Sequence, residues 1–169
     1  MPLTSRSRLI AVLHNIRSMH NVGSILRTAD AVGVEKIYIT GITPSPLDEM
    51  GTPRKDIAKV ALGGAQYVQW DDSVRSTAKL KTLLRQYRDD GYCISAVEQH
   101  KKSTPYHQFR CPEKMVLIMG SETRGLNPAI LTICDVILEI PMLGKKESLN
   151  VAVAFGIIAY YLRFQSKPY

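Results

Sequence analysis

The chain has 169 residues, of which 45% are hydrophobic and 22% are charged, enough for one well-buried domain and too few for a second. We therefore predict a single domain over residues 1–169, in which residues 1–7 form a flexible N-terminus. Lys and Arg number 22 against 15 Asp and Glu, and no acidic residue precedes Asp30. The net charge of +7 favours a polyanionic partner such as a nucleic acid.

The sequence disfavours secreted, metal-dependent and membrane proteins. The three cysteines show no C-x-x-C spacing and the four histidines no H-x-x-x-H pattern, so neither a disulfide framework nor a metal site is expected. The N-terminus has no apolar signal core, and the longest apolar stretch, Val151 to Leu162, is shorter than a membrane span needs. We predict a cytoplasmic protein that needs no metal and no membrane.

Short apolar runs alternate with helical patterns along the chain. Strands are predicted at Leu9 to Leu13, Lys36 to Ile42, Tyr67 to Trp70, Tyr92 to Val97, Met115 to Met119 and Val136 to Ile140. Helices are predicted at Asn21 to Val32, Val74 to Arg88, Pro128 to Ile133 and Leu149 to Phe164. This alternation predicts an α/β fold with a mostly parallel six-stranded sheet and helices on both faces.

Several helix ends have a chemical cause. Asn21 can cap the first helix, and Gly33 can end it in a left-handed conformation. Pro128 suits the first turn of a helix that is capped by Asn127.

Two segments are predicted to be exposed loops, because prolines, glycines and polar residues recur in them. They run from Gly41 to Pro53 and from Lys101 to Pro112. Both could contact a large ligand.

The last helix, Leu149 to Phe164, is apolar nearly all round, which predicts burial on every side. A terminal helix seldom reaches such burial in a monomer. A second subunit would supply the missing cover, and so would a deep position within the chain.

Two loops carry polar residues that a loop does not need for its stability. Residues 119–126 read Met-Gly-Ser-Glu-Thr-Arg-Gly-Leu, and residues 141–150 read Pro-Met-Leu-Gly-Lys-Lys-Glu-Ser-Leu-Asn. Each follows a predicted strand, so both should lie at the carboxyl edge of the sheet, where open α/β sheets bind ligands. The first loop contains G-x-x-x-x-G but lacks the P-loop lysine, and no strand is followed by G-x-G-x-x-G. A conventional nucleotide site is therefore not expected.

The polar residues of these segments have structural and functional interpretations. Glu122 could form a loop salt bridge, or it could steer a substrate or Arg27. Ser148 and Asn150 bracket one leucine, so one of them could cap the last helix, or both could hold a polar ligand. Arg27 could extend along an apolar surface into solvent or bind phosphate with its planar fork.

Together these stretches closely resemble the SpoU, or TrmH-like, branch of the SPOUT RNA methyltransferases. The first family motif is similar to residues 21–33, the second to residues 116–126 and the third to residues 140–154. Residues 61–65, Ala-Leu-Gly-Gly-Ala, are similar to a further family segment but depart from its commoner Ala-Leu-Gly-Ala. The resemblance extends from Arg8 to Arg163, so it leaves no room for a separate RNA-binding domain.

The resemblance implies a deep trefoil knot in the C-terminal part of the sheet and a homodimer formed through the knot and the last helix. It also implies that S-adenosylmethionine binds in a bent shape, held largely by backbone groups of the knot loops. By position this role falls on Ile118, Met119, Gly120, Ile140, Met142 and Leu149.

The implied reaction is methyl transfer to a ribose 2′-hydroxyl of tRNA or rRNA, and it needs in-line alignment and removal of a proton. The motif residues that match are Asn21, Arg27, Glu122, Ser148 and Asn150. In the family the arginine is proposed as the base, activated by an RNA phosphate. Because bound phosphate should keep the guanidinium protonated, positioning and charge stabilisation are at least as plausible a role for Arg27.

The resemblance further implies that Asn21 and Glu122 orient Arg27 or the ribose. It implies that Ser148 and Asn150 hold the knot loop and the substrate. Contacts to the RNA phosphates are predicted for six basic residues: Arg6, Arg8, Arg17, Lys59, Lys101 and Lys102. Two other functions stay open, a non-catalytic RNA-binding protein with the same fold and a SPOUT enzyme that methylates a base.

Overall fold

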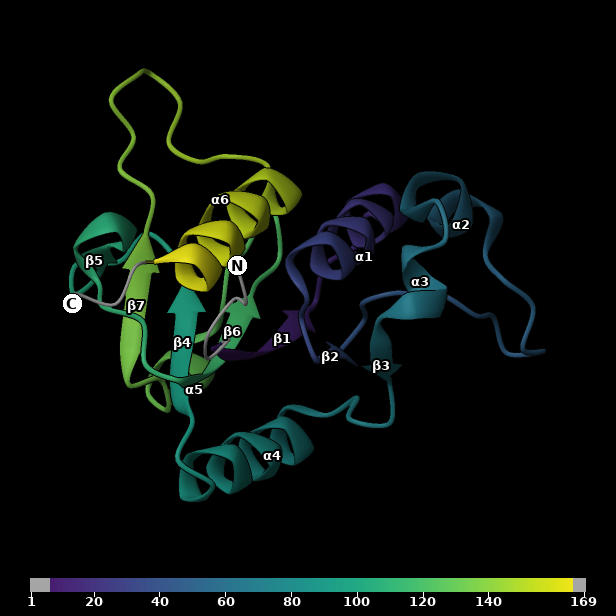
Figure 1. Cartoon of the computed structure of the whole chain (residues 1–169), viewed down its shortest axis with the longest axis horizontal. Helices are drawn as coiled ribbons and strands as arrows, with labels where there is room; N and C mark the ends of the chain where they lie inside the picture. The colour runs from purple at the N-terminus through teal and green to yellow at the C-terminus, as the bar shows by residue number, and fades with distance from the viewer. Residues whose placement is uncertain (1–6, 166–169) are drawn as a thin grey trace, which may run out of the picture.

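The computed structural model describes residues 7–165, and its seven strands form one sheet in the order β3-β2-β1-β6-β4-β7-β5 (Figure 1). Every neighbouring pair of strands runs parallel. The strands are β1 (Arg8–His14), β2 (Lys36–Thr40), β3 (Gln69–Asp71), β4 (Cys93–Val97), β5 (Thr104–Pro105), β6 (Lys114–Met119) and β7 (Val136–Glu139). The predictions for Arg6 and for a flexible N-terminus concern residues that lie outside the described range, apart from Ser7.

The predicted α/β fold with a parallel sheet is confirmed, but the number of strands was wrong. The seventh strand, β5, lies inside the segment Lys101 to Pro112 that we predicted to be a loop. It has two residues, one of them proline, so it shows no alternating pattern in the sequence. It pairs with β7 at the edge of the sheet.

Helices cover both faces of the sheet, as predicted. They are α1 (Met19–Val32), α2 (Lys55–Ala61), α3 (Gly64–Tyr67), α4 (Thr77–Asp89), α5 (Pro128–Leu131) and α6 (Val151–Phe164). Because strand side chains alternate between faces, β1 sends Leu13 toward α1 and α6 and Val12 toward α4 and α5. Each face thus has its own buried apolar cluster, and the two helix layers lie on opposite sides of the strands in Figure 1.

Two of the three predicted helix ends are confirmed. Gly33 ends α1 with a left-handed φ of 75°, and the Asn127 side chain accepts the N–H of Ile130 at the start of α5. The predicted cap of α1 was wrong, because Ser18 caps it by accepting the N–H of Asn21. Asn21 therefore lies in the first turn, and its side chain is available for another contact.

Two short helices, α2 and α3, were not predicted, and glycines bring both against α1. A Cβ atom on Gly23 would lie 2.8 Å from the carbonyl oxygen of Ile57 in α2. A Cβ atom on Gly64 would lie 2.9 Å from the Cα atom of Arg27. The segment 61–65, whose role the sequence left open, thus supplies the glycine that lets α3 contact α1 at Arg27.

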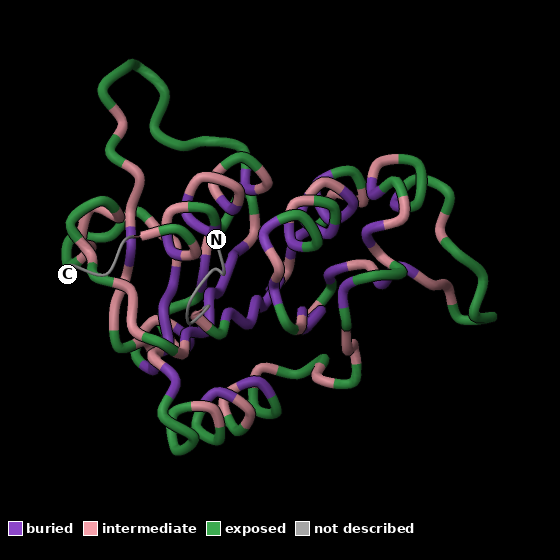
Figure 2. Tube along the Cα trace, in the orientation of Figure 1, coloured by how far each residue is buried: buried purple, intermediate pink, exposed green. Residues whose placement is uncertain are grey.

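The last helix, α6, is buried on one side only, so the predicted burial on every side does not hold within one chain. Phe155, Ile158 and Leu162 are buried against the core, whereas Val153 and Phe164 are 51% and 58% exposed. Figure 2 shows this difference, with exposed residues along the outer side of α6 and in the long loop before it. In the part of the chain that the structure describes, no helix has the length and apolar character needed to cross a membrane.

Candidate functional site

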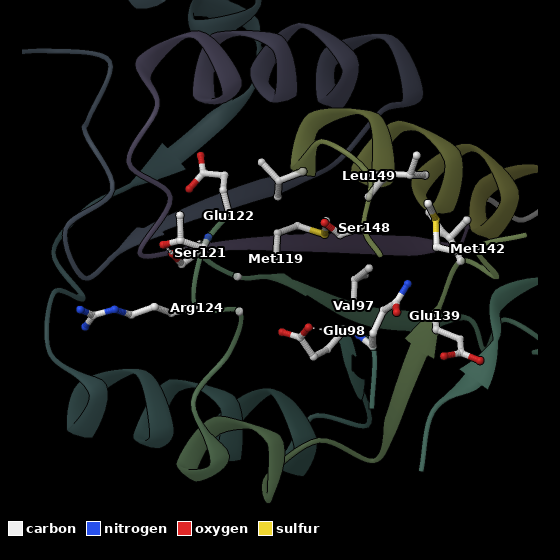
Figure 3. A pocket seen from close by; sticks show the side chains of 17 residues that line it. Val97, Glu98, Met119, Ser121, Glu122, Arg124, Glu139, Met142, Ser148 and Leu149 are labelled. Atoms are coloured by element: carbon white, nitrogen blue, oxygen red, sulfur yellow. Dashed lines mark hydrogen bonds between the residues drawn. The ribbon is translucent and has the colours of Figure 1, made fainter. Parts of the chain in front are cut away.

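A cavity of about 290 Å³ opens at the carboxyl edge of the sheet, beside the ends of β4, β6 and β7 and the start of α6. Five of the six residues predicted to bind the cofactor line it: Met119, Gly120, Ile140, Met142 and Leu149. Figure 3 shows Met119 and Ser148 near its middle, with Met142 at one end and Glu122 at the other. The two loops that the sequence singled out therefore form much of the cavity wall, together with the end of β4 and the start of α6.

The sixth predicted cofactor residue, Ile118, does not line the cavity. It is fully buried on the opposite face of the sheet, in the cluster that packs against α4 and α5. Alternation along β6 explains the difference, because Met119 points toward the face that carries α1 and α6. Only the backbone of Ile118 remains available for the role that was predicted.

Three residues from three distant segments are joined by side-chain hydrogen bonds beside the cavity. Glu122 Oε1 accepts a hydrogen bond from Asn21 Nδ2 at 2.9 Å, and Asn21 Oδ1 accepts one from Asn150 Nδ2 at 3.0 Å. Asn150 Oδ1 in turn accepts the backbone N–H groups of Ala152 and Val153. We call Glu122, Asn21 and Asn150 the polar network.

The start of α6 sets the orientation of the whole polar network. Asn150 caps α6, so its amide oxygen faces the free N–H groups of the helix and its amide nitrogen points toward Asn21. Asn21 then turns its own amide nitrogen toward Glu122. Of the two predicted caps of α6, Asn150 is therefore the actual one, and Ser148 is an exposed residue that lines the cavity.

Glu122 is held as a carboxylate. Partial burial alone would raise its pKa, but the Asn21 amide and the backbone N–H groups of Arg17 and Ser18 outweigh that effect and lower the pKa. The family resemblance implies that Glu122 orients Arg27 or the ribose, yet the side chains of Glu122 and Arg27 share no hydrogen bond or ion pair in the structure. An orienting role of Glu122 toward Arg27 thus stays a prediction.

Glu98, at the end of β4, is a further residue of the site that our sequence analysis missed. Its Oε2 atom accepts the N–H of Leu126 at 2.8 Å, so it ties the loop 120–126 to the neighbouring strand. A Cβ atom on Gly125, which has a left-handed φ of 62°, would lie 2.1 Å from that oxygen. Glu98 also lines the cavity. No family motif or spacing pointed to it, because its partner is 28 residues away.

Arg27 lies apart from the polar network. It is an exposed residue of α1, six residues after Asn21, which corresponds to about 9 Å along the helix. It does not line the cavity, and within residues 7–165 its guanidinium makes no hydrogen bond or ion pair. Its charge is therefore free for a ligand.

The basic residues predicted to contact RNA are spread over the molecule. Lys59, Lys101 and Lys102 are exposed. Arg17 is exposed beside the polar network, and its backbone N–H contacts Glu122. Arg8 begins β1, so it lies at the amino ends of the strands, away from the cavity, and it pairs with Glu35 at 3.1 Å. Among the residues described, no three His, Cys, Asp or Glu side chains gather as metal ligands would.

The chain is similar to known proteins over most of its length. The model of the SpoU rRNA Methylase family matches residues 8–160. A putative TrmH family tRNA/rRNA methyltransferase of Staphylococcus aureus is 30% identical over 151 residues, which cover 89% of this chain and 56% of the relative. The 23S rRNA (guanosine-2′-O-)-methyltransferase RlmB of Neisseria meningitidis serogroup B is 31% identical over 161 residues, 95% of this chain and 60% of the relative. The chain thus spans a little over half the length of these curated relatives.

Solved structures agree with this result. The SpoU methyltransferase AviRb from Streptomyces viridochromogenes, in complex with AdoMet, superposes with a TM-score of 0.82 at 25% identity, over 97% of this chain and 62% of that one. The A. aeolicus TrmH/SpoU tRNA modifying enzyme superposes with a TM-score of 0.78 at 29% identity, over 95% of this chain and 77% of that one. The family model covers all seven strands of the sheet and the polar network, and the chain belongs to the SpoU rRNA methylase family.

Proposed function

We propose that this chain is an S-adenosylmethionine-dependent methyltransferase that acts on a ribose 2′-hydroxyl of tRNA or rRNA. The polar network carries the proposal, because it joins all three motif segments beside one cavity at the carboxyl edge of the sheet. The name of the Neisseria relative, a guanosine-2′-O-methyltransferase of 23S rRNA, supports ribose rather than base as the target.

The lining of the cavity suits S-adenosylmethionine in its apolar character and in its charge. The volume of the cavity and its apolar side chains suit an adenine ring and a methionine chain. The lining holds three carboxylates, on Glu98, Glu122 and Glu139, against the single guanidinium of Arg124. S-adenosylmethionine carries a net positive charge at neutral pH, so this lining should favour it over the neutral product that has lost the methyl group.

The bound cofactor supplies a methyl group that is already electrophilic, so the protein's task is alignment and proton handling. The ionised Glu122 and the amides of Asn21 and Asn150 form a rigid polar edge at which a ribose can be held. Ser148 lines the same cavity, and its hydroxyl makes no hydrogen bond with any described residue, so it is available to the substrate. Arg27 would hold a phosphate and the reacting ribose, with its charge stabilising the developing alkoxide.

The test is direct detection of the product. The protein is incubated with isotopically labelled S-adenosylmethionine and with total RNA from a strain that lacks the gene, and the RNA is digested and analysed by mass spectrometry. We expect label in one 2′-O-methylated nucleoside and none with the Asn21→Ala variant. Label on a base, or no label in RNA while the cofactor binds, would contradict the proposal.

We also propose that the protein is a homodimer through α6, as the family resemblance implies. The exposed side of α6 presents Val153, Tyr160 and Phe164, and the rings of Tyr160 and Phe164 stack with centroids 5.8 Å apart. A row of apolar side chains on an outer helix face marks an interaction surface.

The dimer predicts a specific change in sedimentation. Phe164→Glu should turn a dimer into a monomer at micromolar concentration, because it places a charge in the apolar contact. Met50→Glu is the matched control, since Met50 is 91% exposed but lies in the loop 41–53, far along the chain from α6. A wild-type protein that sediments as a monomer would refute the dimer.

The strand order supports the predicted trefoil knot. After β5 at the edge of the sheet, the chain returns to place β6 between β1 and β4, and then β7 between β4 and β5. The last third of the chain therefore enters positions between strands that precede it in sequence, as a threaded chain must.

The cytoplasm, where RNA and S-adenosylmethionine are available, is the compartment that we propose.

A further inference from the structure

A second hollow, of about 470 Å³, lies beside the polar network, and we call it the arginine groove. It is lined by the loop after β1, the loop after β2, the start of α2 and the segment after β3. Three arginines from three of these segments line it: Arg17, Arg54 and Arg75. The two sites meet at one residue, since the N–H of Arg17 contacts Glu122 while Arg17 itself lines the groove.

The walls of the arginine groove are fixed by hydrogen bonds. Thr43 Oγ1 accepts the N–H of Ile16 and donates to the carbonyl of Leu13, which ties the loop after β2 to the end of β1. Arg75 donates to the carbonyl of Thr43 at 2.6 Å and pairs with Asp72 at 2.7 Å. The groove is thus built before any ligand arrives, and Arg75 is used in building it.

The other two arginines have no such use. Neither the Arg17 nor the Arg54 guanidinium makes a hydrogen bond or an ion pair with any residue of the range 7–165. The Nε–H of Arg54 is buried and has no acceptor among the residues that the structure describes. A buried donor without a partner is costly to a folded protein. Because the Nε atom is closed to solvent, an anion from outside the chain would meet Arg54 at the terminal nitrogens of its guanidinium.

The groove lining also holds three acidic residues, and one of them is paired with an arginine. Asp72 is neutralised by Arg75, and Asp48 accepts the backbone N–H groups of Met50 and Thr52 in its own loop. Two negative charges therefore remain in the lining, on Asp48 and Glu49, and both would oppose an anion. Removing the negative charge of Glu49 should therefore strengthen anion binding, whereas removing an arginine should weaken it.

Building on the proposed function, we propose that the arginine groove binds a phosphodiester of the substrate RNA next to the nucleotide that is methylated, with Arg17 and Arg54 as its ligands. Planar guanidinium groups match the geometry of phosphate oxygens. A strand whose ribose lies at Glu122 would pass directly over Arg17 into the groove. Phosphate contacts of this kind position a strand without reading its sequence.

The test measures binding of a fluorescently labelled, mixed-sequence single-stranded RNA of twelve nucleotides to the full chain by anisotropy. Arg17→Ala and Arg54→Gln should each weaken binding about fivefold to tenfold and lower the salt dependence by about one phosphate contact. Glu49→Gln should strengthen binding. Arg85→Ala is the matched control, because Arg85 is an exposed arginine on α4 and lines neither the cavity at the carboxyl edge nor the arginine groove.

Two further measurements distinguish RNA binding in the arginine groove from a structural effect of the variants and from the proposed methylation. The melting temperature of Arg54→Gln should be unchanged or higher, since the variant removes the buried donor that has no acceptor. The same RNA with neutral methylphosphonate linkages should bind wild type and both arginine variants equally. The groove would be refuted if Arg54→Gln and Arg85→Ala lost RNA affinity equally, or if Arg54→Gln kept wild-type RNA affinity, even if methylation is found. If RNA binding changes as expected but no methylation is detected, the proposed reaction fails and the groove stands.

Discussion

Replacing Gly120 with valine is expected to weaken S-adenosylmethionine binding at least about 100-fold, a change of roughly 3 kcal/mol. A Cβ atom at Gly120 would lie 2.9 Å from both the carbonyl carbon of Gly125 and the backbone nitrogen of Leu126. These are backbone atoms, so the loop 120–126 must move as a whole. That movement breaks the hydrogen bond from Leu126 to Glu98 and deforms the wall of the cavity.

Calorimetry with the purified protein measures this effect, and Gly144→Val is the matched control. Gly144 belongs to the other loop of the site, but a Cβ atom there would meet nothing within 4 Å. We expect the control to bind the cofactor as wild type does. Circular dichroism should show that Gly120→Ala, which adds only the one carbon, stays folded while it loses affinity. Wild-type affinity in Gly120→Val would place the cofactor elsewhere.

The fold could be predicted from the sequence wherever a long pattern exists. The four longer strands of the sheet interior, β1, β2, β4 and β6, are buried on both faces and read as continuous apolar runs. The strand β5 and the helices α2 and α3 are two to seven residues long, too short for a period to show. Their positions depend on contacts with distant segments, such as the close approach of Gly64 to α1.

The candidate site was predictable where motif residues carry side-chain contacts. Asn21, Glu122 and Asn150 were each singled out, and the structure brings them into one network. What the sequence could not give is the direction of that network, because Ser18 rather than Asn21 caps α1 and thereby leaves the Asn21 amide free. Glu98 and the grouping of Arg17 with Arg54 and Arg75 were missed for another reason, since they depend on contacts between residues that are far apart in the chain.

Replacing Arg27 with alanine is expected to reduce ribose methylation at least about 100-fold, the usual cost of removing one preorganised charge-stabilising group. Cofactor affinity should stay nearly unchanged, because Arg27 does not line the cavity. Arg85→Ala is again the control for the loss of one positive charge. Single-turnover rates with the RNA identified by mass spectrometry measure the effect. A methylation rate close to wild type would remove Arg27 from the reaction.

Replacing Arg27 with lysine tests how Arg27 acts. Lysine keeps the positive charge but loses the planar fork, so if Arg27 aligns a phosphate and the ribose together, the substitution should damage the rate almost as much as alanine does. The side chain of Arg27 makes no hydrogen bond within residues 7–165, so lysine breaks none there, and any loss reflects the ligand. If charge alone is needed, the rate should stay within about tenfold of wild type, a barrier change of about 1.4 kcal/mol. That second result would discard the alignment role and leave charge stabilisation as the function of Arg27.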